Sequence, residues 1–183
     1  RLLYKTPAPR SWALYMQGLM VGAKYPDVSA ALDRLGFIER TKTDFLALRE
    51  NTRRAANRLI TAHRDGDTRM STLYEVLSPL EIEGLLYLMA RHGQEHNIGK
   101  DVSLFLTRLR EEKVDISGAD LMLLGETPGP IFGQALRDTL KARLDGKVKN
   151  RDEELAWAAR FIVESREGEK AAQNITEIMS GRL

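Results

Sequence analysis

The chain has 183 residues, of which 43% are hydrophobic and 30% are charged, and its formal net charge is +2. Such a composition is typical of globular proteins, and the length suits one large domain or two small ones. Because the chain has no cysteine, disulfides and thiolate metal sites are excluded and a reducing compartment is favoured, so we expect a cytoplasmic protein. No apolar run approaches the ~20 residues that span a bilayer, and no secretory pattern is present, so we expect no membrane partner.

The first part of the chain predicts two short helices followed by a long one. Residues 1–10 contain two prolines and have the composition of a linker. Because the chain opens at Arg1 and not at a methionine, we expect this linker to continue from a missing upstream part. Helices are predicted over about 11–22, 27–35 and 41–64. Gly36 is placed to end the second of them.

A turn at Asp65-Gly66-Asp67 separates the long helix from a second group of helices. A short helix leads to Ser78, which together with Glu81 predicts a capping box at the start of the next helix. The apolar residues of that helix recur at helical spacing, at Ile82, Leu85, Leu86 and Met89. After a loop over 94–99, a further helix has its expected buried side at Val102, Phe105, Leu106 and Leu109.

Capping signals also divide the last part of the chain. Ser117 with Asp120 predicts the start of a very short helix that Gly125 ends, and Asn150 with Glu153 predicts another helix start. The helix between them is expected to end at Gly146 and to bury Phe132, Leu136, Leu140 and Leu144. The helix after Asn150 is expected to bury Leu155, Ala159 and Ile162, and residues 167–183 could add one more helix.

No segment alternates apolar and polar residues in the way that strands do. We therefore expect an all-α fold, an irregular multi-helix bundle of about eight to nine helices with no sheet. We expect two helical domains, over residues 11–112 and 113–183, and the second contains the stretch GETPGPIFG at 125–133.

This Gly/Pro-rich stretch is the best candidate for binding an anion. A helix that opens near Pro130 directs its free amides and partial positive charge outward, and glycines let a sugar–phosphate chain come close. The expected contacts are the backbone groups of Gly118, Gly125, Gly129, Ile131, Phe132 and Gly133. The alternative is that these prolines and glycines only punctuate helices or allow tight helix crossing.

Basic residues gather in two regions. Residues 137–151 hold six Lys or Arg against two Asp, and residues 40–69 hold eight against four acidic residues. Such clusters suit phosphate contacts, although solvated helices also carry many basic residues. The candidates in the first region are Arg137, Lys141, Arg143, Lys147, Lys149 and Arg151. In the second they are Arg53, Arg54 and Arg58, for which an exposed helix side paired with Glu50 is the alternative.

Other chemistry is weakly indicated. Asp65 and Asp67 resemble a metal-binding Asp-x-Asp pair, but they lie in a turn with no third carboxylate nearby in sequence. His92 and His96 have ligand spacing, but Gly93 interrupts their helix. We therefore predict no metal site and no catalytic residue. The five residues Trp12, Tyr15, Tyr25, Tyr74 and Tyr87 could stack on bases, but such spacings are more typical of a core.

A run of motifs from residue 118 onward resembles the C-terminal helical region of bacterial class II tRNA nucleotidyltransferases and poly(A) polymerases. The matching residues are Gly118, Asp120-Leu121, Leu124-Gly125, Pro128-Gly129-Pro130, Gly133, Leu144-Asp145-Gly146 and Glu153-Glu154-Leu155. Upstream, Arg34-Leu35-Gly36 and the run 83–88 are also similar to the family, so the resemblance spans about residues 12–163.

The resemblance implies an RNA-binding body and tail, over 11–112 and 113–183, without a catalytic head. Such enzymes add nucleotides to RNA 3′ ends, and the parent would use magnesium with ATP or CTP; no cofactor is implied for this fragment. The implied partners are the acceptor and T arms of tRNA, or another structured RNA, and the chain's own N-terminal catalytic head. The head's Gly-Ser or Gly-Gly turn with Asp-x-Asp, and the neck's Glu-Asp-x-x-Arg, are not found in this sequence. We therefore expect no catalysis by this fragment alone.

Recognition would be by shape, with basic side chains and helix-end amides meeting phosphates across an A-form stem. CCA addition, A addition alone and polyadenylation by the parent all remain compatible with these residues. The alternative function is a helical protein–protein interaction module that does not bind RNA.

Overall fold

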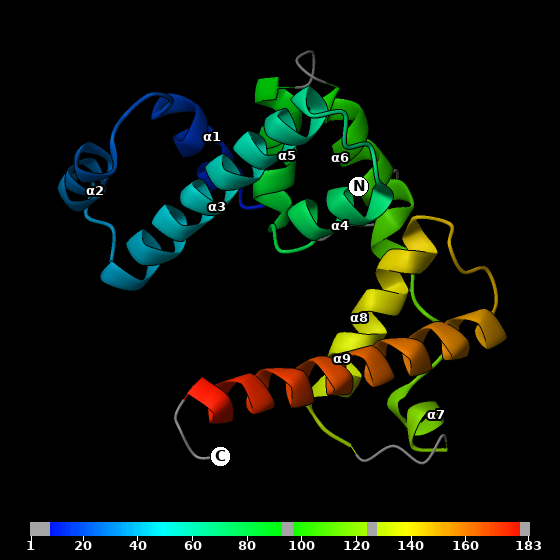
Figure 1. Cartoon of the computed structure of the whole chain (residues 1–183). Helices are drawn as coiled ribbons and strands as arrows, with labels where there is room; N and C mark the ends of the chain where they lie inside the picture. The colour runs from blue at the N-terminus through cyan, green and yellow to red at the C-terminus, as the bar shows by residue number, and fades with distance from the viewer. Residues whose placement is uncertain (1–7, 93–96, 124–127, 180–183) are drawn as a thin grey trace. The chain divides into compact units, whose positions relative to one another are not determined.

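The computed structural model describes residues 8–92, 97–123 and 128–179, with side chains to Arg166 in the last helix (Figure 1). Within these ranges the chain forms nine α-helices and one short 3-10 helix, and no strand, so the all-α prediction is confirmed. The helices are α1 (Ser11–Leu19), α2 (Tyr25–Arg34), α3 (Glu39–Arg64), α4 (Met70–Leu77), α5 (Ile82–His92), α6 (Ile98–Thr107), α7 (Gly118–Leu123), α8 (Pro130–Leu144) and α9 (Arg151–Met179), with the 3-10 helix at Leu109–Glu111.

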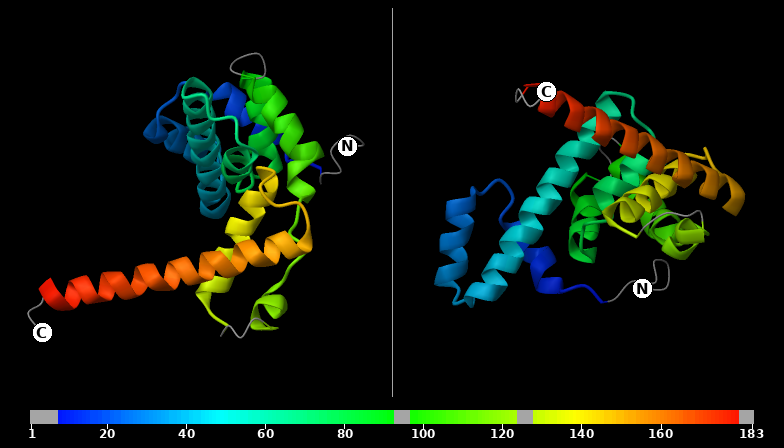
Figure 2. Two further views of the ribbon diagram at one scale, coloured as in Figure 1. Left: turned by 45° about the vertical axis from the view of Figure 1, so that its right-hand side comes forward. Right: turned by 60° about the horizontal axis from the view of Figure 1, so that its bottom comes forward.

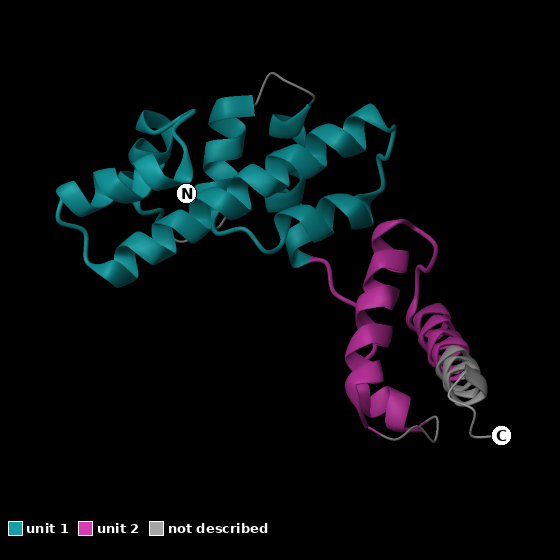
Figure 3. Cartoon of the chain, turned by 60° about the vertical axis from the view of Figure 1, so that its left-hand side comes forward, with its two compact units in different colours: residues 1–111 teal, residues 112–183 magenta. Residues whose placement is uncertain are grey.

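The chain divides into two compact units, over residues 1–111 and 112–183 (Figure 3). Unit 1 holds α1 to α6 and the 3-10 helix, and unit 2 holds α7, α8 and α9. The body and tail roles expected for these parts stay predictions. Of the expected linker, residues 1–7 lie outside the described residues, while Arg10 donates from its backbone N–H to Glu83 of α5 over 2.7 Å.

The long helix α3 supplies much of the unit 1 core and runs past α2, α4 and α5 (Figure 1). Its expected apolar residues Phe45, Leu48 and Leu59 are buried, and Ile60 is half-buried. They belong to a helix face that also buries Thr52, Ala55 and Ala56. The small size of these three side chains lets neighbouring helices pack closely against this face.

Glycine ends α2 as predicted. Gly36 has a φ of +73°, which side chains rarely tolerate, and Phe37 N–H donates back to the Leu32 carbonyl over 3.1 Å. This is the left-handed helix end that favours glycine. Gly146 ends α8 in the same way, with a φ of +72° and a 2.8 Å bond from Lys147 N–H to the Ala142 carbonyl.

The predicted start of α5 is wrong by several residues. Ser78 is the C-terminal cap of α4, and α5 begins at Ile82. The carboxylate of Glu81 accepts a hydrogen bond from the Arg10 side chain and not, as the expected capping box requires, from Ser78. The sequence pattern does not contain this partner because Arg10 is 71 residues away.

Both helix starts expected in unit 2 are confirmed, and each contains one of the two bonds of a capping box. Ser117 donates from its backbone N–H and its hydroxyl to the Asp120 carboxylate, over 2.7 and 2.9 Å. At the start of α9, Glu153 N–H donates to the Asn150 side chain over 2.9 Å, and the Asn150 amide donates to Glu153 over 2.8 Å. These bonds satisfy polar groups that a helix start leaves without partners.

The buried face of α8 is rotated from the predicted one. Phe132 is buried as expected, but the other buried positions are Ala135, Thr139 and Ala142, whereas Leu136, Leu140 and Leu144 are half-buried. Ala135 belongs to one core cluster with Ala158 and Ile162 of α9. Small residues on this face let α8 and α9 approach closely, so size complementarity decides which face is buried, and not hydrophobicity alone.

The last helix is longer than expected. Residues 167–179 continue α9 and do not form the separate helix predicted there. Among the side chains described in this helix, Glu154, Ala158 and Ile162 are fully buried, while Leu155 and Ala159 are half-buried. Among the described residues, no helix combines the length and the apolar character needed to cross a lipid bilayer.

Candidate nucleic-acid interface

The expected RNA-contacting residues lie in both units. Arg53, Arg54 and Arg58 are on α3 of unit 1. The others belong to α7, to α8 with its flanking segments, and to the start of α9, all in unit 2. Gly125 lies outside the described residues.

The first turn of α8 has no acidic side chain of its own. Its N-cap is Gly129, which has extended backbone and no side chain that caps the helix, and its first turn has no acidic residue. The first turns of α7 and α9, in contrast, contain Asp120 and Glu153. Among the backbone groups expected to contact an anion, the amide of Phe132 donates to the Gly129 carbonyl over 3.1 Å. The positive end of the α8 dipole therefore has no acidic side chain of its own turn beside it.

Packing within the described residues does not require the glycines of this segment. A Cβ atom on Gly129 would meet nothing within 4 Å, and one on Gly118 would lie 3.7 Å from a ring carbon of Phe132. On Gly133 it would lie 3.6 Å from Nη1 of Arg137, which is an ordinary contact with a flexible side chain. Gly84 is different, because a Cβ there would lie 2.7 Å from Oγ1 of Thr52. Tight helix crossing thus explains Gly84 but not the glycines at the start of α8.

Arg137 lies beside this helix start. Its guanidinium is close to Gly133, one turn earlier on α8, and its side chain is exposed. It forms no ion pair with any residue that the structure describes. A cation beside the positive end of a helix is unfavourable unless an anion is bound between them. The structure thus brings Gly133 and the Arg137 guanidinium together near the start of α8.

Arg143 is engaged inside unit 2. Its guanidinium pairs with Glu154, with Asp115 over 2.7 Å and with Glu112 over 3.7 Å. The Glu154 side chain is fully buried and also accepts from the Asp115 backbone N–H over 2.7 Å. Hydrogen bonds to Asp115 and then to Glu154 raise the pKa of Arg143 above its usual value. This arginine joins the segment before α7 to α8 and α9.

Lys147 belongs to a small aromatic cluster that the sequence analysis did not single out. Its ammonium lies 5.7 Å from the ring centre of Trp157, and the Arg160 guanidinium lies 4.5 Å from the same ring. The indole N–H donates to Asp138 over 2.8 Å, which fixes the ring. The spacing of Trp157 and Arg160, three residues apart on a helix, was the available signal.

The remaining basic residues of unit 2 differ in their partners. Arg151 pairs with Asp120 over 2.5 Å, and Asp120 has its pKa lowered mainly by hydrogen bonds from Ser117. Lys149 is exposed, and its backbone N–H donates to Glu153 over 2.8 Å. Lys141 is half-buried on α8.

In unit 1, one carboxylate holds two of the three candidate arginines. Glu50 accepts bonds from Arg53 over 2.9 and 3.0 Å and from Arg54 over 2.7 Å. The bonds from Arg53 and then Arg54 lower the pKa of Glu50 to about 2. Arg58 is exposed and forms no ion pair with a described residue. The alternative of an exposed helix side partnered by Glu50 thus describes how Arg53 and Arg54 are arranged.

The described residues do not provide a metal site. They contain no group of three or more His, Asp or Glu side chains placed to hold a metal ion. Asp67 accepts bonds from Arg69 and Thr72 within its turn, and His63 pairs with Asp101 over 2.5 Å. His96 lies outside the described residues. The magnesium implied for a parent enzyme therefore does not fit the residues described here.

Comparison with known proteins gives one clear similarity. The chain is 31% identical over 168 residues to an A-adding tRNA nucleotidyltransferase from Geobacter sulfurreducens. The similar region covers 87% of this chain but 18% of that protein, so the chain spans less than a fifth of its relative's length. No protein-family model and no solved structure matches the chain. The similarity supports a relationship with the tRNA nucleotidyltransferases.

Proposed function

We propose that this chain is the RNA-binding part of a template-independent RNA nucleotidyltransferase. It binds the acceptor and T arms of a tRNA and positions the RNA 3′ end for nucleotide addition elsewhere in the full protein. The similarity to an A-adding enzyme favours A addition over CCA addition or polyadenylation as the parent activity.

The observation that carries this proposal is the start of α8. There, glycine backbone that packing leaves open, a helix end without an acidic residue and the exposed Arg137 lie together. Helix N-termini with adjacent basic side chains are well suited to phosphate. Because phosphates are spaced regularly along an A-form stem, such a site recognises shape and not base sequence.

Further phosphate contacts come from the other end of α8. Lys147 is held over the Trp157 ring, and Lys149 is exposed two residues later. Arg143 contributes indirectly, since its three carboxylate partners join the segment before α7 and the start of α9 to α8. Neutralising a phosphate-contacting side chain should weaken binding to all stems to a similar degree.

The test is a comparison of two charge reversals of equal size. Arg137→Glu removes a proposed phosphate contact, whereas Lys113→Glu changes an exposed lysine of the same unit that lies outside the α8 surface. Binding to an acceptor–T-arm minihelix would be measured by fluorescence anisotropy, with an unstructured RNA of equal length as the control ligand. We expect Arg137→Glu to weaken minihelix binding about 10-fold or more and Lys113→Glu to change it much less.

Equal effects of the two reversals would show that binding depends on overall charge and not on the α8 site. Tighter binding to the unstructured RNA than to the minihelix would contradict shape recognition. Gly129→Ala gives an independent check, because its new methyl group meets open space in the protein but would stand in the path of a phosphate.

A protein-contact function has one observation in its favour. Large apolar side chains are exposed at several positions of α1, α2 and the segments after them: Trp12, Tyr15, Leu19, Val21, Tyr25, Leu35 and Ile38. Exposed apolar groups of this kind are typical of interaction surfaces. If the minihelix does not bind, this surface becomes the better indication of function, and reversing Arg137 would leave such a contact intact.

A further inference from the structure

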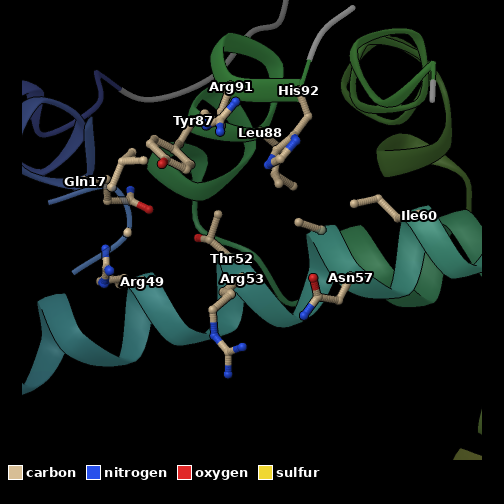
Figure 4. A pocket seen from close by; sticks show the side chains of 13 residues that line it. Gln17, Arg49, Thr52, Arg53, Asn57, Ile60, Tyr87, Leu88, Arg91 and His92 are labelled. Carbon is tan, nitrogen blue, oxygen red and sulfur yellow. The ribbon is translucent and has the colours of Figure 1, made fainter. Parts of the chain in front are cut away.

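A pocket of about 260 Å³ lies in unit 1, apart from the α8 surface. Side chains from α1, α3 and α5 line it, and Figure 4 shows Gln17, Thr52 and Tyr87 directed into the same space from these three helices. All the lining residues belong to unit 1. Among them, Arg53 was expected to contact RNA, and Tyr87 was considered for base stacking but judged more typical of a core.

Gln17 of α1 is a buried polar residue of the pocket lining. Its side chain is buried, with 1% of the residue exposed, and Nε2 has no hydrogen-bond partner among the described residues. A buried amide that gives up water without gaining an acceptor is destabilising, and native proteins rarely leave one unpaired. The pocket lining thus contains a buried amide donor that no described residue satisfies.

The charge of the lining selects an anionic ligand. Three arginines and His92 line the pocket, and none of the described lining residues carries a carboxylate. Arg49 donates to the Ala23 carbonyl over 2.6 Å, and Arg53 pairs with Glu50. Arg91 is exposed and pairs with no described residue, so it is the cation placed to meet an anionic group.

The rest of the lining suits a flat, largely apolar group. Tyr87 offers an aromatic ring, and Ile60, Leu88 and Val21 add aliphatic surface. The volume lies just below the roughly 300–1,000 Å³ of pockets for drug-sized ligands, so it suits one nucleotide and excludes a duplex. Aromatic rings stack on bases of any sequence. A side-chain amide in the pocket can in addition donate a hydrogen bond to an acceptor on the edge of the base.

We propose that this pocket binds one unpaired nucleotide. Its base would lie against Tyr87 and accept a hydrogen bond from Nε2 of Gln17, and its phosphate would meet Arg91 at the pocket mouth. The ligand is either a free nucleoside monophosphate or an unpaired nucleotide of a bound RNA. The second source rests on the proposed function, whereas the first does not.

The experiment follows the side-chain amide of Gln17 directly. In the ¹⁵N-labelled full chain, its NH₂ resonances are assigned by their loss in Gln17→Met. AMP, GMP, CMP, UMP and inorganic phosphate are titrated separately. We expect a saturable shift of these resonances with at least one nucleotide, and a smaller effect of phosphate alone. Arg91→Gln and Tyr87→Ala should each weaken that binding about 10-fold, and Arg64→Gln, an exposed arginine of α3 that does not line the pocket, should not.

A second measurement separates a ligand-binding amide from a structural one. Gln17→Met keeps the size of the side chain but removes the unpaired donor, so the ligand-free variant should unfold at the same or a higher temperature than the original chain. A clearly lower Tm would show that Gln17 has a partner within the folded protein, and would overturn the proposal. The absence of a saturable Gln17 shift, both with the four nucleotides and with a minihelix carrying a single-stranded 3′ overhang, would also overturn it.

The two ligand sources are distinguished by comparing minihelices with and without that overhang. A Gln17 shift with the overhang alone would assign the pocket to an unpaired RNA nucleotide, and a shift with nucleoside monophosphates alone would assign it to the free ligand. Failure of the proposed RNA function is seen separately, because Arg137→Glu should weaken minihelix binding about 10-fold or more without changing the response to mononucleotides.

Discussion

The pair formed by Arg143 and Glu154 shows that a basic residue beside a candidate RNA surface can serve the fold. Glu154 is fully buried, and Arg143 supplies its countercharge. We predict that Arg143→Ala destabilises unit 2 by about 3–5 kcal/mol, because it leaves a buried carboxylate without its partner. Urea unfolding followed by the fluorescence of Trp157, in a Trp12→Phe background, measures the effect in this unit.

Arg137→Ala is the matched control, since Arg137 is exposed on the same helix and has no ion pair among the described residues. We expect it to change stability by no more than about 0.5 kcal/mol. Similar losses from the two variants would show that helix packing, and not the buried pair, sets the stability of this region.

The glycines of the two units should respond in opposite ways to an added methyl group. Gly84→Ala would place a Cβ 2.7 Å from Oγ1 of Thr52, which is itself bonded to the Leu48 carbonyl, so α3 and α5 must move apart. A loss of about 1–3 kcal/mol is expected. Gly133→Ala meets only the flexible Arg137 at 3.6 Å, and the better helix propensity of alanine should raise stability by up to ~1 kcal/mol.

Chemical denaturation of both glycine variants measures these changes. A destabilised Gly133→Ala would mean that the first turn of α8 has less space than its geometry indicates. If Gly133→Ala is at least as stable as the original chain and yet binds RNA more weakly, the glycine serves the ligand and not the fold.

Sequence patterns predicted residue types at the candidate site better than their partners. The open glycines and the basic side chains follow from composition alone. The partners of Arg143 do not, because Glu112, Asp115 and Glu154 come from segments that only the fold brings together. Trp157 was missed for the same reason, since its contact with Lys147 joins α9 to the segment after α8.

At the scale of elements, Glu83 joins the start of α1 to α5. Burial alone would raise the pKa of Glu83, but the hydrogen bonds from the Arg10 side chain and backbone outweigh it and hold that pKa below its usual value. A lowered pKa means that the carboxylate stabilises the fold above the unfolded pKa of about 4.3, and that this contribution is lost as the pH falls through the folded pKa.

We therefore predict that the original chain loses more of its free energy of unfolding in acid than the Glu83→Gln variant loses. The free energy of unfolding would be measured between pH 7 and pH 3. The original chain should be the more stable at pH 7, and the difference should shrink as the pH falls below about 4. Glu81→Gln is the control, because Glu81 also pairs with Arg10 but is exposed, so its change should be smaller. A constant difference at all pH values would exclude this carboxylate as the cause.

Helix ends were more predictable than helix faces. Ser117 with Asp120, Asn150 with Glu153, and the terminal glycines are local signals, because a cap is formed by residues a few positions apart. The buried face of α8 depends on the helix it packs against, so the spacing of its leucines predicted the wrong set of buried residues. The start of α5 was mistaken in the same way, through a distant partner of Glu81.

For the whole molecule, the absence of strand patterns was sufficient to predict the all-α class. The resemblance in the motifs from residue 118 onward pointed to the same family as the similarity to an A-adding enzyme. The pocket around Gln17 could not be predicted, because its lining comes from segments as far apart as residues 17 and 92. A single buried amide without a partner has no signature in a sequence.

Net charge gives the last prediction, since a chain with a formal charge of only +2 must bind RNA through local clusters if it binds at all. Each phosphate that a side chain neutralises releases counterions, so the slope of log Kobs against log salt counts the contacts. We predict that the double variant Arg137→Gln/Lys149→Gln lowers the magnitude of this slope for the minihelix by about 2, roughly 1 for each contact.

The same double variant distinguishes direct contacts from a general effect on the fold. Weaker binding with an unchanged slope would mean that these side chains act through structure, which the thermal unfolding temperature would reveal. If Lys113→Gln lowers the magnitude of the slope equally, binding would depend on the electrostatic potential of the whole unit and not on these two contacts. A smaller slope in the double variant alone, with unfolding unchanged, is the result expected if phosphates meet α8 at Arg137 and the following loop at Lys149.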